Sequence, residues 1–442
     1  MAFKSSMFNH YVENEDEELV LYNSLQGTSS IRLVGEEKRE KIKEWIDQKG
    51  PMEEQEDPDF QKLVEYGYLI PPDRDEKALR EMKYMERIMD PTLYLVVHTT
   101  GACNFRCQYC AADFDKKAMP REIQDSLIRF VRRNINKYNR VMISWFGGEP
   151  LLEMEVIDYV SQKVMEICRK AHKPYTAAVT SNGYLLSPRN LEILIRSRVI
   201  YYTITVDGLK ETHDLQRFLA GGGPSFDVII ENLRFIRDHI KNQSVHVNIR
   251  TNVTREILEI LPEYYAFYDK EFGMDPRFSL FVRLAGDWGG DRVKKMHDSL
   301  MDIRNVGQIY RALMKLDGSI KFYTNFSDLE FAGASCLATL KHKYTIGTEG
   351  QITKCDDSDF EYLIGRLLPD GGAEIDEAEE ARWVTGHRRV SKGCGDCYYS
   401  GACMENCCPK NGLIYSHHDC GFFFGVDDLL LLAAKSLNVE KI

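Results

Sequence analysis

Three cysteines lie close together in the stretch "HTTGACNFRCQYCAADF", which runs from His98 to Phe114. Cys103, Cys107 and Cys110 have the spacing C-x3-C-x2-C. A cubic [4Fe–4S] cluster is normally held by four thiolates, so three thiolates on one tight loop would leave the fourth iron open to another ligand. Zinc is the alternative metal, but a structural zinc site needs four ligands, and no obvious Cys or His completes this loop. We expect His98 to be a hydrogen-bonded neighbour of the site rather than a ligand.

The remaining cysteines are unevenly distributed. Of the twelve in the chain, only Cys168 lies between Cys110 and Cys336, whereas eight lie from Cys336 to Cys420. Part of this region, "CGDCYYSGACMENCC", has the spacing C-x2-C-x5-C-x3-C. Because disulfides do not persist in a reducing cytosol, this clustering indicates metal or cluster ligation. Cys168 lies in the helical pattern "VMEICRKA" and is expected to be a small core residue.

Composition limits the class of protein. The chain has 442 residues, enough for two or three domains, and a formal net charge of −11. Nucleic acids and anionic membranes favour basic partners, so neither is expected to bind. No basic segment followed by an apolar stretch marks a signal peptide, and no apolar run approaches the about 20 residues of a membrane-spanning helix. We therefore predict a cytoplasmic protein.

An alternation of strands and helices from Leu93 onward must position the first cysteine loop. The predicted strands are rich in β-branched and aromatic residues, and helical patterns separate them. This pattern predicts a parallel α/β sheet, either doubly wound or a partial (β/α)6 barrel. The predicted strands cover residues 93–100, 141–148, 175–183, 199–208, 245–254 and 277–284.

Residues that could do chemistry follow four successive strands. The cysteine loop follows the first strand, Gly147–Pro150 the second, Ser181–Gly183 the third and Asp207 the fourth. In a parallel α/β sheet the functional groups lie at the carboxyl ends of the strands. The sequence therefore predicts an active site at this edge of the sheet.

The segment "CNFRCQYC" resembles the signature of the radical S-adenosylmethionine (radical SAM) enzymes, including the aromatic residue before the third cysteine. The resemblance implies that Cys103, Cys107 and Cys110 ligate a [4Fe–4S] cluster whose open iron is chelated by S-adenosylmethionine. Reductive cleavage of this cofactor would give a 5′-deoxyadenosyl radical, which abstracts a hydrogen from the substrate.

The same resemblance implies a set of cofactor contacts. "GGEP" is similar to the segment that binds the amino group of the cofactor, "TSNG" to the segment that contacts its ribose, and "TVDG" is typical of the fourth strand. An aromatic ring before the third cysteine could pack beside the adenine. Arg217 in "HDLQRFLAGG" is the candidate for the cofactor carboxylate, with a surface salt bridge as the alternative. The implied residues are Tyr109, Gly147, Gly148, Glu149, Pro150, Ser181, Asn182, Asp207 and Arg217.

The C-terminal cysteines resemble the SPASM domain, which carries two auxiliary [4Fe–4S] clusters. The resemblance implies that one cluster is held by Cys394, Cys397, Cys403 and Cys420, and the other by Cys336, Cys355 and Cys407. Some members of the family have a further cysteine soon after the first, but this chain has none between Cys336 and Cys355. The second cluster would then have an open iron, unless Cys408 closes it. An open iron is a site for a soft ligand such as a substrate thiolate, which favours thioether formation as a hypothesis.

The first ninety residues differ from the rest of the chain. Residues 18–33 predict a hairpin, 36–46 and 60–67 two helices, and 68–72 a short strand. We expect either a winged-helix-like module or an extension packed on the main domain. The segment loosely resembles the leader-peptide recognition module of peptide maturases, which pairs a peptide strand with its hairpin. Its acidic "ENEDEE" would prefer a basic leader.

The predicted architecture is therefore a leader-binding module (1–90), a partial barrel (91–320) and a SPASM domain with two clusters (321–442). We predict that the protein modifies a ribosomally made precursor peptide, forming thioether links from cysteine to carbon. An external one-electron reductant of the flavodoxin or ferredoxin type is the expected further partner.

Several alternatives to thioether formation stay open. In an anaerobic sulfatase maturase, Asp356 of "KCDD" would be the catalytic base, although the long N-terminal segment counts against this reading. Asp356 could instead deprotonate a substrate thiol or cap a turn. Peptide epimerisation and carbon–carbon cross-linking use the same apparatus, and a zinc-binding scaffold is a more distant alternative.

Overall fold

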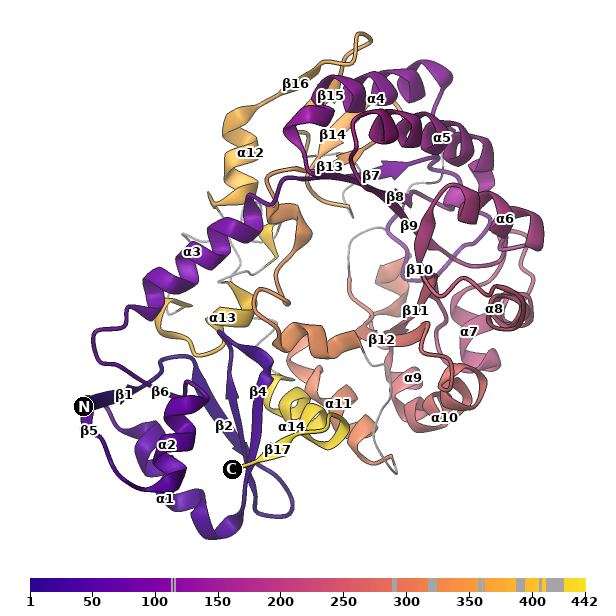
Figure 1. The fold of residues 1–442 in the computed structure, drawn as a ribbon. Coiled ribbons are helices and arrows are strands. Elements are labelled where there is room, and N and C mark those ends of the chain that lie inside the picture. The colour runs from indigo at the N-terminus through magenta and orange to yellow at the C-terminus, as the bar shows by residue number, and fades with distance from the viewer. Residues whose placement is uncertain are drawn as a thin grey trace.

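The structure is a computed structural model. It describes residues 1–112, 114, 117–287, 292–316, 324–356, 360, 362–386, 394–404, 408–410 and 425–442. Figure 1 shows an arc of strands covered by helices, an N-terminal part below it, and C-terminal segments that lie against both. None of the helices in these ranges has the length and apolar character needed to cross a membrane.

Six parallel strands form the arc, and each of the six predicted strands is present. They pair in chain order, so that every strand lies beside the one before it. Right-handed crossovers that always add a strand on the same side leave all the helices on one face. The partial barrel is therefore confirmed and the doubly wound alternative is wrong. The strands are β7 (Thr92–His98), β8 (Arg140–Phe146), β9 (Tyr175–Ser181), β10 (Val199–Thr205), β11 (His246–Val253) and β12 (Phe278–Leu284).

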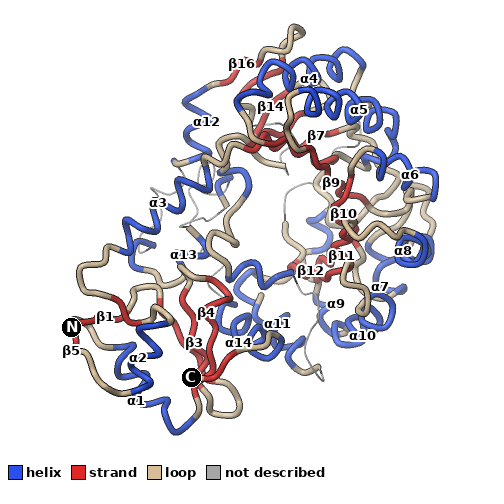
Figure 2. Tube along the Cα trace, viewed as in Figure 1, coloured by secondary structure: helices blue, strands red, loops and turns tan. Residues whose placement is uncertain are grey.

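Helices cover the outer face of this arc (Figures 1 and 2). Alternate strand residues such as Ile143, Val179 and Ile249 are fully buried against them and form the main hydrophobic core. The helices are α4 (Arg121–Asn134), α5 (Met154–Lys170), α6 (Pro188–Arg196), α7 (Lys210–Gln216), α8 (Phe226–His239), α9 (Arg255–Glu259), α10 (Leu261–Phe272) and α11 (Gly307–Met314).

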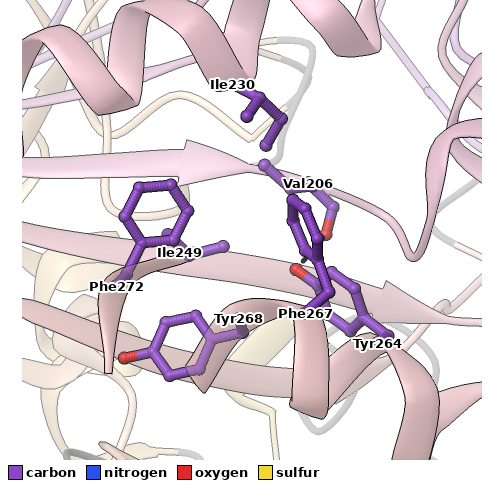
Figure 3. Close-up of a pocket in the computed structure, with 7 residues that line it drawn as sticks. All are labelled: Val206, Ile230, Ile249, Tyr264, Phe267, Tyr268 and Phe272. Carbon is purple, nitrogen blue, oxygen red and sulfur yellow. Dashed lines mark hydrogen bonds between the residues drawn. The ribbon is translucent and has the colours of Figure 1, made fainter. Parts of the chain in front are cut away.

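A small apolar pocket lies between the sheet and helices α8 and α10 (Figure 3). The Tyr264 hydroxyl donates a hydrogen bond to the Val206 carbonyl at 3.1 Å and so ties α10 to the sheet. The lining contains no cysteine or carboxylate, and we assign this pocket to the core rather than to a site. It is lined by Val206, Ile230, Ile249, Tyr264, Phe267, Tyr268 and Phe272.

The C-terminal region extends the same sheet beyond β7. β13 (Lys343–Ile346) pairs in parallel with β7, and three short antiparallel strands follow it. The result is a single ten-stranded sheet, so the predicted boundary at residue 320 does not separate two sheets. The further elements are β14 (Gln351–Thr353), β15 (Gly365–Leu367), β16 (Ala373–Ile375), α12 (Glu377–Val384), α13 (Ser400–Cys403) and α14 (Val426–Ser436).

The N-terminal part contains the predicted hairpin, both predicted helices and the short strand. β1, β2, β5 and α3 are additions, and β5 has only two residues, which is too short for a sequence pattern. The elements are β1 (Ala2–Ser5), β2 (Asn9–Glu13), β3 (Leu19–Asn23), β4 (Gly27–Val34), α1 (Glu36–Asp47), β5 (Met52–Glu53), α2 (Pro58–Glu65), β6 (Leu69–Ile70) and α3 (Glu76–Ile88).

The outer edge of the predicted hairpin, β3 and β4, is partly covered. β3 lies between β2 and β4, and β4 pairs on its other side with β17 (Glu440–Lys441), as Figure 1 shows. The Ile442 amide donates to the Leu33 carbonyl at 2.9 Å, and the Ile442 side chain is buried in the N-terminal core. Residues 440–442 therefore occupy only part of the β4 edge, beside Arg32 and Leu33, and the expectation that a peptide strand pairs with this hairpin stays a prediction.

Helix α3 connects the N-terminal part to the C-terminal region. Arg80 is buried and donates to the Ser400 hydroxyl at 2.8 Å, while Lys77 and Asp396 form an ion pair at 2.7 Å. Tyr84 of α3 belongs to a small core together with residues of the C-terminal region. By its packing, α3 therefore belongs with the C-terminal region rather than with residues 1–75.

Candidate active site

The loop that follows β7 carries Cys103, Cys107 and Cys110, and the "GGEP" segment after β8 packs against its first half. The Gly148 amide donates to the Thr100 carbonyl at 2.9 Å, and the Glu149 amide donates to the Ala102 carbonyl at 2.8 Å. A Cβ on Gly148 would lie 2.2 Å from the Ala102 carbonyl oxygen, which no real side chain tolerates. Gly148 is therefore required for this close approach of two backbones.

The other side of the cysteine loop is held by the segment after α7. The Arg106 amide donates to the Phe218 carbonyl at 2.9 Å, and the Gln108 amide donates to the Gln216 carbonyl at 3.0 Å. The cysteine loop therefore lies between two backbone segments that come from distant parts of the chain. Such bracing on both sides pre-organises the three thiols.

Arg292 supports the end of the loop, and its role is not predicted from the sequence. Its guanidinium donates to the carbonyls of Cys110 and Ala112, the latter at 2.7 Å. The Phe114 ring lies between two guanidinium groups, 4.2 Å from that of Arg106 and 4.4 Å from that of Arg292. No local pattern could reveal this contact, since Arg292 is 182 residues from Cys110 in the sequence.

The Glu149 carboxylate connects the "GGEP" and "TSNG" segments. It accepts hydrogen bonds from the Ser181 hydroxyl at 2.8 Å, the Asn182 amide at 2.8 Å and the Leu151 amide at 3.0 Å. Asn182 in turn donates through its side chain to Asn104 on the cysteine loop at 2.7 Å. Burial raises the pKa of Glu149, and the hydrogen bonds from Asn182, Leu151 and Ser181 oppose that rise. Both oxygens are used within the protein, so this side chain braces the site.

A second polar cluster joins the loop to β10 and β11. The Tyr109 hydroxyl donates to Asp207 and accepts from Arg217 at 2.5 Å and from Asn252 at 3.1 Å. Arg217 and Asp207 form an ion pair at 3.7 Å, and both side chains are almost fully buried. Burial raises the pKa of Asp207, and Arg217 opposes this rise.

This cluster revises one expectation about Arg217. The alternative of a surface salt bridge is wrong, because only 5% of Arg217 is exposed. Within the described part of the chain, the Arg217 Nε atom is buried without a hydrogen-bond partner. An unused buried donor beside Tyr109 and Cys107 is a feature that a bound anionic group would satisfy.

The donor set of the loop fits a thiolate-bound cluster. Burial raises the pKa of the Cys103 thiol to about 12 and that of the Cys107 thiol to about 11. A buried thiolate needs a positive partner, and the iron of a cluster supplies one. The loop thus offers three soft donors and is held on both sides by backbone contacts, one of which requires a glycine. This arrangement is consistent with the predicted three-thiolate ligation.

The structure describes only some of the predicted ligands of the auxiliary clusters. Cys407 and Cys420 lie outside the described residues. Desolvation of its thiol raises the pKa of Cys336 to about 11, and the charges of Cys408 and Asp356 add to this rise, while Lys343 opposes it. The side chains of Cys408, Asp356 and Lys343 therefore lie close enough to Cys336 to act on its thiol. Of the other described ligand candidates, Cys355 follows β14, Cys394 and Cys397 lie before α13, and Cys403 is the last residue of α13.

Asp356, the predicted base, is paired with the first residue of β13. One of its oxygens, Oδ1, accepts from the buried Lys343 ammonium and from the Thr345 hydroxyl at 2.7 Å. Its other oxygen has no partner among the described residues, and a third of the side chain is exposed. Asp356 therefore does not cap a turn with Oδ1, and Oδ2 can accept a proton from a ligand.

At the margin of the site, Cys168 behaves as expected from the sequence, and His98 packs among aromatic rings. Cys168 is buried in α5 within the main core. The His98 ring lies between the rings of Phe146 and Phe360, at 5.3 and 5.0 Å. His98 thus packs beside the cysteine loop.

Comparisons with known proteins agree with this site. Residues 97–261 match the Radical SAM superfamily. The serine-type anaerobic sulfatase-maturating enzyme of Bacteroides thetaiotaomicron is 29% identical over 353 residues, which are 72% of this chain and 83% of that protein. The GTP 3′,8-cyclase of Aliarcobacter butzleri is 39% identical over 98 residues, 21% of this chain and 28% of that one.

Two solved structures share the fold. The anSMEcpe structure with bound AdoMet has a TM-score of 0.59 at 17% identity, covering 78% of this chain and 96% of that one. Streptococcus suis SuiB bound to its precursor peptide SuiA has a TM-score of 0.51 at 14% identity, covering 95% of this chain and all of that one. The superfamily match shows that residues 97–261 form a radical SAM domain, and the two likenesses show the fold that the chain shares with these structures. Such a domain implies S-adenosylmethionine and one [4Fe–4S] cluster as cofactors.

Proposed function

We propose that this radical SAM enzyme modifies a peptide substrate and that Cys103, Cys107 and Cys110 hold its catalytic cluster. The observation that carries the proposal is the hydrogen-bonded connection from the cysteine loop through Asn182 to Glu149. It joins three predicted cofactor-binding segments at one edge of the sheet. S-adenosylmethionine held there would supply one-electron radical chemistry for removing a hydrogen atom from the substrate.

The protein's own residues position this chemistry. The backbone of Gly147 to Pro150 and the side chain of Asn182 are the groups we assign to the methionine and ribose parts of the cofactor. The Glu149 carboxylate holds the Asn182 amide, and the pair of Asp207 and Arg217 holds the Tyr109 hydroxyl; all three charged side chains are almost fully buried. A rigid arrangement matters because a small misplacement of a radical centre from its target hydrogen costs rate.

A peptide is the substrate class that the likenesses favour. The SuiB structure, which this chain matches over 95% of its length, was solved with a precursor peptide. The anSMEcpe fold was solved with a bound peptide as well, at a TM-score of 0.59. Among the described residues, β2 and the two-residue β17 are the edge strands of the N-terminal sheet, and we assign leader docking to the outer edge of β2, the longer of the two.

We further propose that the C-terminal cysteines hold two auxiliary [4Fe–4S] clusters and that the product is a thioether. Cys394, Cys397, Cys403 and Cys420 are assigned to one cluster, and Cys336, Cys355 and Cys407 to the other. A thioether forms when sulfur loses its proton, the partner carbon loses a hydrogen atom to the radical, and one electron leaves. Cys336 and its partners would hold the centre that accepts this electron, and a flavodoxin- or ferredoxin-type carrier would exchange electrons with the protein.

The catalytic assignment is tested by replacing Cys103, Cys107 and Cys110 together with alanine. We expect production of 5′-deoxyadenosine from S-adenosylmethionine under dithionite to stop, because no cluster remains to deliver the electron. Cys168→Ala is the matched control and should retain cofactor cleavage, since Cys168 lies in the core of α5. Cleavage by the triple variant at the rate of the control would contradict the assignment.

Sulfatase maturation is the second candidate function. It is favoured by the Bacteroides relative and by Asp356, whose Oδ2 atom has no partner in the described part of the chain. Formylglycine is an aldehyde, whereas a thioether is not. A product that reacts with a hydrazide probe would identify the maturase, and a product without free thiol or aldehyde would identify the thioether enzyme.

A further inference from the structure

The inner face of the barrel sheet, which is turned away from the helices, is polar. Parallel strands buried on both faces are normally apolar throughout. Here the outward residues of β9, β10 and β11 are buried and mostly apolar, whereas most of the inward residues that alternate with them carry polar groups. The inward polar residues include Thr176, Thr180, Thr203, Thr205, Asn248 and Ser279, and all except Thr205 are half-buried.

Arg250 lies in the middle of this inner face. It alternates along β11 with Ile249 and Thr251, which face the helices, and its side chain is half-buried. Its Nε atom donates to the Asn252 side chain at 3.1 Å. No carboxylate within the described part of the chain lies within salt-bridge distance of its guanidinium.

Two other cations on the inner face have carboxylate partners. Arg283 of β12 pairs with Asp328 at 2.7 Å, and Lys343 of β13 pairs with Asp356. Arg250 therefore differs from its neighbours because, in the described part of the chain, its hydrogen bond goes to a neutral side chain, and the Asp207 carboxylate acts on it only from beyond ion-pair distance. A half-buried guanidinium with unused donors is suited to a planar anion that can accept two parallel hydrogen bonds.

We propose that Arg250 binds a carboxylate of the substrate, so that this enzyme selects peptides with an Asp or Glu near the modified residue. This inference rests on the proposed peptide-modifying function. The cofactor carboxylate is the other source of such a group. Arg250 precedes Asn252 by two residues, and thus lies roughly 7 Å further from the carboxyl edge than the cluster that joins Asn252, Tyr109 and Asp207. The position favours the substrate, because the predicted cofactor contacts lie at the edge.

The test measures binding of peptides rather than turnover. The probe is a set of synthetic peptides of one length. Each peptide has one cysteine and carries Ala, Asp, Asn or Lys at the other positions. The set is mixed with reconstituted protein and S-adenosylhomocysteine in the absence of oxygen. Retained peptides are identified by mass spectrometry. We expect the wild type to enrich Asp over Asn at one position by about tenfold, the size of one charged hydrogen bond. Arg250→Gln should abolish this preference, and Arg250→Glu should replace it with a preference for Lys.

A parallel measurement distinguishes the two sources of carboxylate. Equilibrium dialysis with labelled S-adenosylmethionine should give the same affinity, within about twofold, for the wild type, Arg250→Gln and the control Arg255→Gln. Arg255 follows Thr254 on the exposed start of α9 and donates to the Asp298 carbonyl. A loss of cofactor affinity in Arg250→Gln, with the Asp preference retained, would assign Arg250 to the cofactor and overturn the proposal.

The remaining outcomes separate this inference from the proposed function. Retention of peptides by the wild type without any Asp preference contradicts the role of Arg250 alone. Retention of no peptide contradicts both the role of Arg250 and the peptide-modifying function. Equal iron content in all variants shows that their cores and cluster sites are intact. The conservative variant Arg250→Lys keeps the positive charge and should therefore keep part of the Asp preference.

Discussion

Single residues in this site have two kinds of role, metal ligation and bracing, and the structure shows which residues can have which role. The cysteines offer soft donors to a metal centre, whereas Glu149 and Asp207 use their carboxylates to hold neighbouring loops together. The distinction has a physical basis in burial. Glu149 is 1% exposed and accepts three hydrogen bonds from the protein, so little of its carboxylate is left for a ligand.

The role of Glu149 can be tested by an almost isosteric change. In Glu149→Gln, the amide group would place a donor against either the Asn182 amide or the Ser181 and Leu151 donors. One buried hydrogen bond is then lost, at a cost of about 1–3 kcal/mol. We expect the apparent affinity for S-adenosylmethionine to fall roughly tenfold or more in equilibrium dialysis.

Glu155→Gln is the matched control for this change, because Glu155 lies on the exposed first turn of α5. It should bind S-adenosylmethionine as the wild type does. An unchanged affinity in Glu149→Gln would show that the connection between the two segments does not position the cofactor.

At the level of elements, the order of the strands explains where the chemistry lies. β7 to β10 are neighbours in the sheet, so the four segments that follow them meet at one edge. The strands of the N-terminal sheet are not all neighbours in the sequence, because one edge of this sheet is formed by β17, from the other end of the chain. Residues 440–442 thus pair with part of the β4 edge, and the Ile442 side chain fills part of the N-terminal core.

The contribution of this segment to stability can be measured at Ile442, of which 6% is exposed in the N-terminal core. Ile442→Ala removes buried aliphatic surface and should lower the free energy of unfolding of this part by about 2 kcal/mol or more. We expect faster hydrogen exchange of the β4 amides as a result. Leu437→Ala, at a residue that is 37% exposed, should leave the exchange of β4 nearly unchanged. Equal exchange in the two variants would show that residues 440–442 do not hold the edge.

At the scale of the whole molecule, the barrel and the C-terminal region share one sheet, and α3 ties the N-terminal part to both. Removing residues 1–90 would therefore also uncover the core around Tyr84. A cut before α3, at residue 75, is the better test of leader binding, because it leaves Arg80 against Ser400.

Metal content tests the assignment of the whole cysteine set. We expect roughly twelve irons and as many sulfides per chain after anaerobic reconstitution, as three [4Fe–4S] clusters require. About four irons together with zinc would leave the catalytic cluster in place but remove the electron acceptor on which the thioether proposal depends. Cys408→Ala should leave the iron count unchanged if the second auxiliary cluster has an open iron. A loss of iron in that variant would show that Cys408 is a ligand.

The sequence by itself determined the strands, their order of appearance and the spacing of the cysteines. These features follow from local patterns, because alternation of strands and helices and the distance between cysteines are visible in short windows of sequence. The predicted site residues also meet at one edge, as expected for parallel strands. Tertiary structure alone decided the contacts between distant segments: Arg292 on the Cys110 carbonyl, the buried state of Arg217, the unpaired Arg250 on the inner face and β17 against β4. Such contacts depend on how separate elements pack in space, and no periodicity or spacing in the sequence encodes them locally.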